Sequence, residues 1–595
     1  MAQRFLAQTL IGMTCLAIML VTAGFIARYS VNVPHWDEWQ ASAPVVLKTA
    51  QGTLTLADLL KPHDQPRIFF THLTTALVTA LAAWDVRVQM WVSFALAILS
   101  FGVFLAIQQR THPSSALWLA VPFALLIFAV RQRQNWLMGF QTAWFFWLFF
   151  TVLALWLLVR LPVRTVSLVP IIVCTVGASY AYLSGLALAF AMLPALWLRG
   201  YRKPIHYGVW LGSAAVYVGL YFTNYAFIDQ GFRTDVTAQL WHYPLYVLRY
   251  LGAPFVPDEP DYQAHATVFG VFGVALAVIN LSYLRYKLPT VNLAVPLVLI
   301  LMSVANGALA SIGRVKPDLL EYFWARPTVS RYVTAANLFW IALLMLGAMA
   351  LWQAGRERRL IAIANIAMFS AAALGYVYAN LTTPTYIATP EDRLCVLNYM
   401  RAPHDNCLFR VNADRSGYLA TAQQLGAYRL TSFYDWYLDF EPAAQPAEAH
   451  LQFLSSIADP PVFKEQPPDQ YAPERAVVLY QHPPSIAEQY LQLPQAEQVH
   501  FEAEIYVDLR NIFEHPEVLQ TGALFRLGIR EGRSVKTLYE GVFDVRTDRA
   551  PIPMRADLSA WRGQRVILVY QTEVREGIPF YAWAMWRKPR IVASP

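Results

Sequence analysis

Charge is scarce in this sequence of 595 residues. Only 14% of the residues are Asp, Glu, Lys or Arg, 56% are hydrophobic and the mean hydropathy is +0.36, whereas soluble proteins contain about 25% charged residues. This composition excludes an ordinary soluble protein and predicts a polytopic α-helical membrane protein. The basic residues behind the net charge of +7 are scattered over short loops, so they indicate membrane topology and no nucleic-acid partner.

Signatures of nucleotide and zinc binding are also missing. The sequence has no Walker loop, no GxGxxG turn after a strand and no HExxH helix. It therefore indicates no cofactor, and it leaves a need for a divalent metal open. Long apolar runs are missing beyond about Asn380, where a stretch with ordinary charge and many prolines begins. We expect a membrane domain over 1–385, a proline-rich α/β region over 386–495 and a β-sandwich over 496–595.

About eleven apolar segments are long enough to be membrane spans. They lie near 6–26, 87–107, 115–130, 141–159, 165–181, 184–198, 206–224, 266–284, 290–311, 333–352 and 361–380. The first could instead be a signal peptide, but the residues before Tyr29 lack a clean small-x-small cleavage site. We interpret Ile68–Ala83 as a helix along the outer membrane interface, because polar residues occupy its first turns. The first outer loop then covers 28–86.

Basic residues alternate from loop to loop and predict the orientation of the chain. The loops expected in the cytoplasm carry Arg110, Arg160, Arg164, Arg199, Arg202, Lys203, Arg285, Lys287, Arg356, Arg358 and Arg359. The N-terminus would then be cytoplasmic, and everything after Asn380 would be exported. In a bacterium this predicts an inner-membrane protein with a periplasmic C-terminal domain.

The first outer loop contains the run His35-Trp36-Asp37-Glu38-Trp39. A carboxylate beside an apolar surface is desolvated, which raises its pKa toward that of a useful general base. Asp37 and Glu38 are therefore candidate catalytic residues, and solvated loop charges are the alternative. The tryptophans also fit an interfacial aromatic belt.

Several arginines face outward, against the charge trend. Arg131 and Arg133 precede the Gly139-Phe140-Gln141 run, Arg314 opens a later loop, and Arg326 and Ser330-Arg331-Tyr332 close it. Outward arginines contribute nothing to topology, and guanidinium groups bind phosphate through two parallel hydrogen bonds. Binding of a phosphate on a substrate and binding of anionic lipid headgroups both remain open.

The run from His35 to Trp39, the run His63-Asp64-Gln65-Pro66-Arg67-Ile68-Phe69-Phe70 and the layout of the spans together resemble the GT-C superfamily of polyprenyl-phosphate-sugar-dependent glycosyltransferases. The resemblance covers about 380 residues. Such enzymes carry an acidic catalytic residue in the first outer loop, although many have a Glu-His-Arg run where this chain has Asp64-Gln65-Pro66-Arg67. The resemblance implies that Asp37, with Glu38 beside it, deprotonates an acceptor hydroxyl. The sugar would come from a polyprenyl phosphate in the bilayer and pass to a glycan acceptor. The implied substrate-binding residues are His35, His63, Asp64, Arg67, Arg131, Arg133, Gln141, Arg314, Arg326, Arg331 and Tyr332.

The C-terminal part shows strand alternation beyond about Val499. Ala523, Phe525, Leu527 and Ile529 share one face, as do Val566, Leu568 and Tyr570. The stretch 557–566, followed by 580–586, resembles galactose-binding-like jelly rolls of carbohydrate-binding modules. Trp583 and Trp586 would then be either core residues or a sugar-stacking platform. Cys395 and Cys407 could form a disulfide in an exported segment, and two buried thiols are the alternative.

Two other functions compete with a glycosyltransferase. A transporter of lipid-linked glycans would line its pathway with charges inside the spans, but the charges here cluster in outer loops. A non-catalytic envelope-assembly protein would hold glycans with its jelly roll and would not need Asp37.

Overall fold

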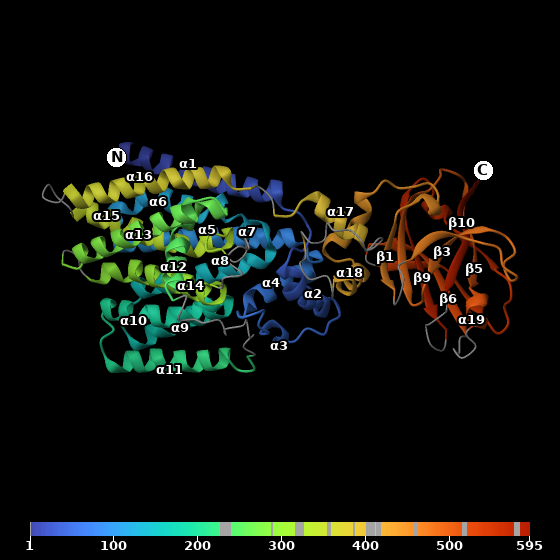
Figure 1. Ribbon diagram of the computed structural model, residues 1–595, viewed down its shortest axis with the longest axis horizontal. Helices are drawn as coiled ribbons and strands as arrows, with labels where there is room; N and C mark the ends of the chain where they lie inside the picture. Colours follow the sequence, from blue (N-terminus) through green and yellow to red (C-terminus); the bar gives the residue numbers. More distant parts are fainter. Residues whose placement is uncertain are drawn as a thin grey trace. The chain divides into compact units, whose positions relative to one another are not determined.

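The computed structural model describes residues 2–225, 240–286, 290–315, 326–353, 359–384, 387–399, 411, 418–456, 461–514, 521–532, 534–575 and 583–595. The chain forms two compact units, coloured along the sequence in Figure 1. The first unit consists of Met1–Ser30, Leu54–Leu77 and Val86–Ile387. The second consists of Val31–Thr53, Val78–Asp85 and Ala388–Pro595. The first outer loop is thus divided between the two units.

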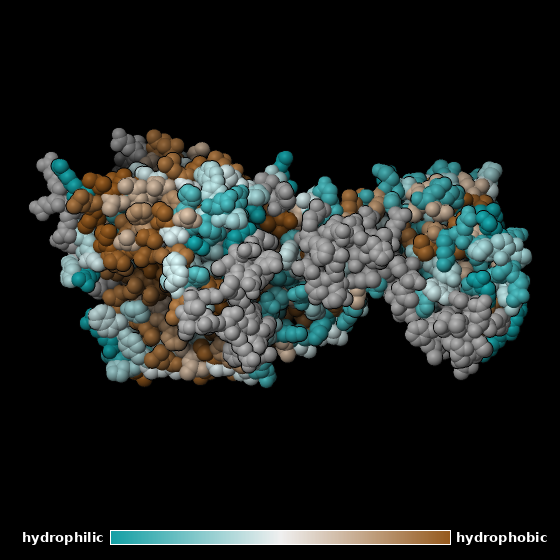
Figure 2. All heavy atoms as spheres, viewed as in Figure 1, coloured by the Kyte–Doolittle hydropathy of each residue, from teal (hydrophilic) through white to brown (hydrophobic). Residues whose placement is uncertain are grey.

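The first unit is a bundle of apolar helices. Among the described residues, eight helical segments are long and apolar enough to cross a membrane. They are built on α1 (Ala2–Tyr29), α5 (Val86–Thr111), α6 (Pro113–Ile127) with α7 (Arg133–Leu137), α8 (Thr142–Arg160), α13 (Gln263–Leu284), α14 (Ala294–Arg314), α15 (Val333–Gln353) and α16 (Arg359–Thr382). Large apolar side chains remain exposed on this unit, and Figure 2 shows them in brown over the helices. The chain is a polytopic α-helical membrane protein.

Three of the expected spans form shorter helices. These are α9 (Leu168–Ala181), α10 (Leu188–Arg199) and α11 (Pro204–Tyr221), followed by the short α12 (His242–Gly252). A 3-10 turn separates α9 from α10 at Gly185, where a Cβ atom would lie 2.1 Å from the carbonyl oxygen of Ala178. Only glycine permits this close approach. The helix α9 ends before Tyr182, whose backbone is extended, so the two apolar runs form separate helices. The loop residues Lys287, Arg356 and Arg358 lie outside the described residues.

The first outer loop contains α2 (Ala43–Ala50), α3 (Leu56–Leu59) and α4 (Phe69–Ala82). At 14 residues α4 is about 21 Å long, whereas the hydrocarbon core of a bilayer is about 30 Å thick. It is shorter than the eight candidate spans, as are the apolar helical segments Thr165–Ala181 and Leu183–Arg199. Thr75 on its buried face accepts a hydrogen bond of 2.9 Å from Nε2 of Gln89, while Leu77 and Leu81 stay exposed.

The second unit contains α17 (Pro390–Tyr399), α18 (Tyr418–Ala427) and a β-sandwich with the short α19 (Leu509–Glu514). The strands are β1 (Leu451–Ser456), β2 (Val462–Gln466), β3 (Ala476–Gln481), β4 (Ser485–Gln492), β5 (Gln498–Val507), β6 (Gly522–Glu531), β7 (Ser534–Asp544), β8 (Ile552–Asp557), β9 (Arg565–Val574) and β10 (Ala584–Ser594). They form two antiparallel sheets in the orders β1-β4-β9-β6-β7 and β2-β3-β10-β5-β8. Strands β1 to β4 precede residue 496, so the sandwich includes part of the proline-rich region.

The predicted inward faces of β6 and β9 form the sandwich core. Ala523, Phe525, Leu527, Ile529, Val566, Leu568 and Tyr570 are all buried. Trp586 is also buried and donates a hydrogen bond of 2.8 Å from its indole nitrogen to Gln481, so it is a core residue and not a sugar platform. Trp583 is half-buried, with its ring 4.9 Å from that of Tyr480. Cys395 is in a disulfide, and Cys407 lies outside the described residues.

Candidate functional site

The run from His35 to Trp39 forms a fixed turn within the second unit. Trp36 has a φ angle of 49°, which is uncommon for a residue other than glycine. Its backbone nitrogen donates a hydrogen bond of 2.6 Å to the carbonyl oxygen of Val411. The indole nitrogen of Trp39 donates to the carbonyl oxygen of Pro34 at 2.8 Å, and its ring lies 4.5 Å from that of Tyr418. These contacts set the direction of the turn.

A second pair of contacts fixes the start of the same turn. The hydroxyl of Ser432 donates a hydrogen bond of 2.7 Å to the carbonyl oxygen of Asn32. The hydroxyl of Thr431 lies 3.3 Å from the amide oxygen of Asn32. Both residues follow α18, so the turn after the first helix is held by side chains about 400 residues further along the chain.

The two adjacent carboxylates differ in environment. Glu38 is 1% exposed, and its Oε2 accepts a hydrogen bond of 2.7 Å from the backbone nitrogen of His35. The Glu38 carboxylate thus closes the turn from inside, and His35 is itself buried there. Asp37 is only partly buried, and its side chain does not cap the π-helix Glu38–Ser42 that follows it. Of the two, Asp37 is the one whose carboxylate can meet a substrate.

His63, Asp64 and Arg67 lie together on a tight turn of the first unit, closed by a bridge between Pro62 and Arg67. All three guanidinium nitrogens of Arg67 donate to main-chain carbonyl oxygens, of Tyr221, Leu60 and Thr223. These bonds use one donor of each guanidinium nitrogen, so Arg67 joins the turn to the end of α11. Asp64 is exposed, and the His63 ring packs edge-on against Phe140 at 5.3 Å.

His72, one turn into α4, is a neutral structural residue. Burial lowers its pKa to about 4, with smaller contributions from His63 and Lys61. Its Nδ1 lies 3.0 Å from the carbonyl oxygen of Leu59. His72 is therefore uncharged at neutral pH and adds no cation to this region.

The structure brings three of the outward arginines together. Arg131 is fully buried, and Arg133, Arg326 and Asp258 act on it electrostatically. Arg133 lies 4.0 Å from the Asp258 carboxylate, and Arg326 is 8% exposed. Arg131 donates to the carbonyl oxygens of Val256 at 2.6 Å and Thr328 at 2.5 Å. These four residues, which we call the cationic cluster, combine three guanidinium groups with one carboxylate.

Unpaired donors remain in the cationic cluster. Within the described part of the chain, Nη1 of Arg131 and both Nε and Nη1 of Arg326 are buried without a hydrogen-bond partner. Burying a guanidinium donor without a hydrogen-bond partner costs free energy, and a bound oxyanion would accept these hydrogen bonds.

The sequence analysis did not identify Asp258 as a partner of these arginines. The signal available was an acidic residue in Pro257-Asp258-Glu259-Pro260, on a loop expected to share the arginines' side.

The other two outward arginines form a separate group. Arg314 and Arg331 both act electrostatically on Tyr246 and Tyr332. Burial raises the pKa of Tyr246 well above its usual value, and Tyr332 raises it further, while the two arginines oppose the shift.

Gln141 is buried just before α8, with its backbone nitrogen 3.1 Å from the Met138 carbonyl oxygen. In the described residues, no group of three or more His, Cys, Asp or Glu is arranged to hold a metal ion.

Neither a protein-family model nor a curated protein sequence matches the chain. Among solved structures, one similar protein is the archaeal oligosaccharyltransferase AglB from Archaeoglobus fulgidus, in complex with an inhibitory peptide and a dolichol-phosphate. It aligns with a TM-score of 0.38 and 12% identity over 68% of this chain and 59% of its own. Another is the arabinosyltransferase EmbB from Mycobacterium smegmatis, with a TM-score of 0.30 and 13% identity over 97% of this chain and 64% of its own. The chain spans less than two thirds of either protein. In structure it is similar to an oligosaccharyltransferase and to an arabinosyltransferase.

Proposed function

We propose that the chain is a membrane glycosyltransferase of the GT-C type, which moves a sugar from a polyprenyl phosphate to an envelope glycan or lipid-linked acceptor. The observation that carries this proposal is the fixed turn in which Glu38 is buried as a structural carboxylate and Asp37 remains partly exposed. In the proposed reaction, Asp37 takes the proton of the acceptor hydroxyl. The oxygen then attacks the anomeric carbon, and the bond from that carbon to the phosphate oxygen breaks.

The cationic cluster is the proposed site for the donor phosphate. Within the described residues, Arg131 and Arg326 bury guanidinium donors without a hydrogen-bond partner, so a bound phosphate would reduce the cost of burying them. Arg326, and Arg131 through its unpaired Nη1, are the residues that we expect to contact the phosphate. The other two guanidinium nitrogens of Arg131 donate to carbonyl oxygens and hold it in place. The cluster belongs to the first unit and Asp37 to the second, so each assignment rests on its own contacts.

Replacing Arg326 with lysine should weaken binding of undecaprenyl phosphate about tenfold. The charge is kept, but the planar fork that matches two phosphate oxygens is lost, and one charge-assisted hydrogen bond contributes about 1.5–3 kcal/mol. Binding can be measured by titrating the purified chain in detergent. Arg110→Lys, at the exposed C-terminal end of α5, is the matched control and should bind as the wild type does. Equal affinities for the Arg326→Lys and Arg110→Lys variants would show that the cluster is structural.

The proposal also places the C-terminal unit outside the cytoplasm, in the periplasm of a bacterial cell. A cysteine introduced at Arg110 or Arg202 should be shielded from a membrane-impermeant thiol reagent in intact spheroplasts. A cysteine at Asp261 or Glu497 should be labelled. The natural background is low, because the free thiols of Cys15 and Cys174 are buried and Cys395 is in a disulfide. Labelling at Arg110 and Arg202, with none at Asp261 and Glu497, would show that the chain has the opposite orientation in the membrane.

The activity itself is tested by mass analysis of envelope glycans from cells with and without the chain. Loss of one sugar from a defined glycan is the expected result, restored by the wild-type protein. The purified chain should then transfer that sugar from its polyprenyl phosphate in detergent solution. Unchanged glycans in the absence of the chain would reject the proposal.

A further inference from the structure

Three side-chain oxygen atoms of the first unit are buried without a hydrogen-bond partner among the described residues. They are Oε1 of Gln134, Oδ1 of Asp258 and Oε1 of Gln263. We call these three atoms the acceptor group, because amide and carboxylate oxygens accept hydrogen bonds and do not donate them. Leaving a buried acceptor without a partner costs free energy. A ligand that donates hydrogen bonds would therefore stabilise this region.

One short segment before α15, from Thr328 to Ser330, contacts all three residues of the acceptor group. The hydroxyl of Thr328 accepts a hydrogen bond of 2.8 Å from Nε2 of Gln263. The backbone nitrogen of Ser330 donates to Oδ2 of Asp258 at 3.2 Å. The hydroxyl of Ser330 accepts a hydrogen bond of 3.4 Å from the backbone nitrogen of Gln134. Thr328 and Ser330 are themselves fully buried, so the three residues belong to one region of the first unit.

The same segment also contacts the cationic cluster. Nη2 of Arg131 donates to the carbonyl oxygen of Thr328 at 2.5 Å, and Arg326 lies two residues before Thr328 in the chain. Thr328 thus joins Arg131, which has an unpaired donor, to Gln263, which has an unpaired acceptor. Asp258 belongs to both sets of residues. A phosphate bound by the guanidinium donors would therefore bring the group attached to it close to the acceptor group.

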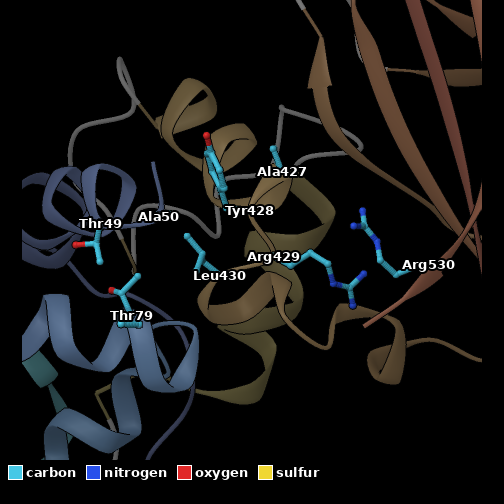
Figure 3. Close-up of a pocket in the computed structure, with 9 residues that line it drawn as sticks. Thr49, Ala50, Thr79, Ala427, Tyr428, Arg429, Leu430 and Arg530 are labelled. Carbon is cyan, nitrogen blue, oxygen red and sulfur yellow. The ribbon is translucent and has the colours of Figure 1, made fainter. Parts of the chain in front are cut away.

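Buried arginines of the second unit have acceptors within the protein. A pocket of about 370 Å³ in that unit is lined by residues between Thr49 and Arg530, and Figure 3 shows Arg429 and Arg530 in it. Nη1 of Arg429 donates to the buried carboxylate of Glu488 at 3.0 Å, and Nη2 donates to the carbonyl oxygen of Tyr434 at 2.7 Å. Nε of Arg530 donates to the same carboxylate at 2.7 Å. This pocket therefore gives no comparable argument for a ligand.

We propose that the acceptor group recognises the donor sugar through a hydrogen-bond donor on C2 of the sugar ring. This inference rests on the function proposed above and identifies residues that select the sugar. The phosphate is attached to C1, so the group on C2 is the ring substituent nearest to the guanidinium donors. It donates to Oε1 of Gln263, which shares Thr328 with Arg131. The chain thereby rejects a donor sugar that has no hydroxyl or N–H group on C2.

The test measures binding of lipid probes to the purified full chain in nanodiscs. The probes are undecaprenyl phosphate, its glucosyl and mannosyl forms, which differ in configuration at C2, and the 2-deoxy-2-fluoro counterpart of each sugar. Fluorine is close in size to a hydroxyl group but cannot donate a hydrogen bond. The tighter of the two sugar-bearing lipids should bind about tenfold more tightly than undecaprenyl phosphate, and its fluoro counterpart should lose that gain. Equal binding of the fluoro counterpart, or no gain from either sugar, would overturn the proposal.

Two glutamine variants provide a matched comparison. Gln263→Met keeps the length of the side chain and removes the amide oxygen, so affinity for the tighter sugar-bearing lipid should fall about tenfold, with affinity for undecaprenyl phosphate unchanged. Gln108→Met is the control, because Gln108 is also buried with an unpaired Oε1. It donates to Ser115 at the start of α6, about 22 Å along that helix from the end that precedes the cationic cluster. Equal losses for both lipids in Gln263→Met would show that Gln263 only supports Thr328, and would reject the proposal.

Binding of undecaprenyl phosphate alone separates this inference from the proposed function. If the chain binds this lipid and gains nothing from a sugar, the sugar site is rejected and the donor-phosphate site stands. If it binds neither undecaprenyl phosphate nor a sugar-bearing lipid, both proposals are rejected. A sugar preference that depends on Gln263, in a chain that transfers no sugar, would keep the sugar site and reject the glycosyltransferase.

Discussion

Replacing Asp37 with asparagine should lower the rate of sugar transfer about 10²–10⁴-fold, the range lost when a general base is removed. Asparagine has nearly the same shape as aspartate and cannot accept the proton of the acceptor hydroxyl. The Asp37 side chain does not cap the helix that follows it, so the turn should keep its structure. The measurement is single-turnover transfer by the purified chain with saturating donor.

The neighbouring carboxylate supplies the control. Glu38→Gln retains an oxygen that can accept the hydrogen bond from His35, so the turn should form and transfer should stay within about tenfold of the wild type. The comparison is sharp because the two residues are adjacent and both changes remove one negative charge. An inactive Glu38→Gln variant beside an active Asp37→Asn variant would assign the base to Glu38 instead.

Replacing Glu488 with alanine should destabilise the β-sandwich by about 3–5 kcal/mol, the cost of breaking a buried ion pair from one side. The change leaves Arg429 and Arg530 buried close together without their shared carboxylate. It also removes the acceptor of the Trp436 indole. Hydrogen exchange of β4 and β6 peptides in the full chain should become faster, because local opening then costs less free energy.

An exposed ion pair on the same domain gives the matched control. Glu465 on β2 and Arg475 are 68% and 69% exposed and lie 3.3 Å apart. Exposed pairs contribute about 0–1 kcal/mol, so Glu465→Ala should leave the exchange rates nearly unchanged. If Glu488→Ala exchanged no faster than Glu465→Ala, the buried triad would not hold the sheet.

Hydrophobic periodicity predicted much of this fold, because it is a local property. The long apolar segments became helices, and the alternation over Ala523–Ile529 became β6 with the expected buried face. Strands before residue 496 were harder to predict. In β4 both Glu488 and Gln489 are fully buried, so the strand lacks the apolar–polar alternation that marks a half-buried strand. Two arginines far away in the sequence make that burial possible.

The sequence predicted which residue types form the candidate site, but it did not predict which groups these residues contact. The acidic pair pointed to Asp37 and Glu38, yet only the folded structure shows that Glu38 is buried and accepts a hydrogen bond from the backbone of His35. Arg67 is the same residue type as the other candidate phosphate-binding residues, but each of its guanidinium nitrogens donates to a main-chain carbonyl oxygen, a contact that a sequence does not display. The pocket of Arg429 joins residues between 49 and 530, a separation that no local pattern records.

The contacts that hold the turn of Asp37 have a consequence for the timing of biosynthesis. Asn32 leaves the ribosome about 400 residues before Ser432, which at about 5–20 residues per second is a delay of roughly 20–80 s. Throughout this interval the membrane helices can insert while the turn lacks Val411, Thr431 and Ser432 to fix it. Under the function proposed above, we expect a newly inserted chain to stay inactive until its C-terminal part has been made and folded. Truncation after α16 should keep the eight candidate spans of the described residues and abolish sugar transfer.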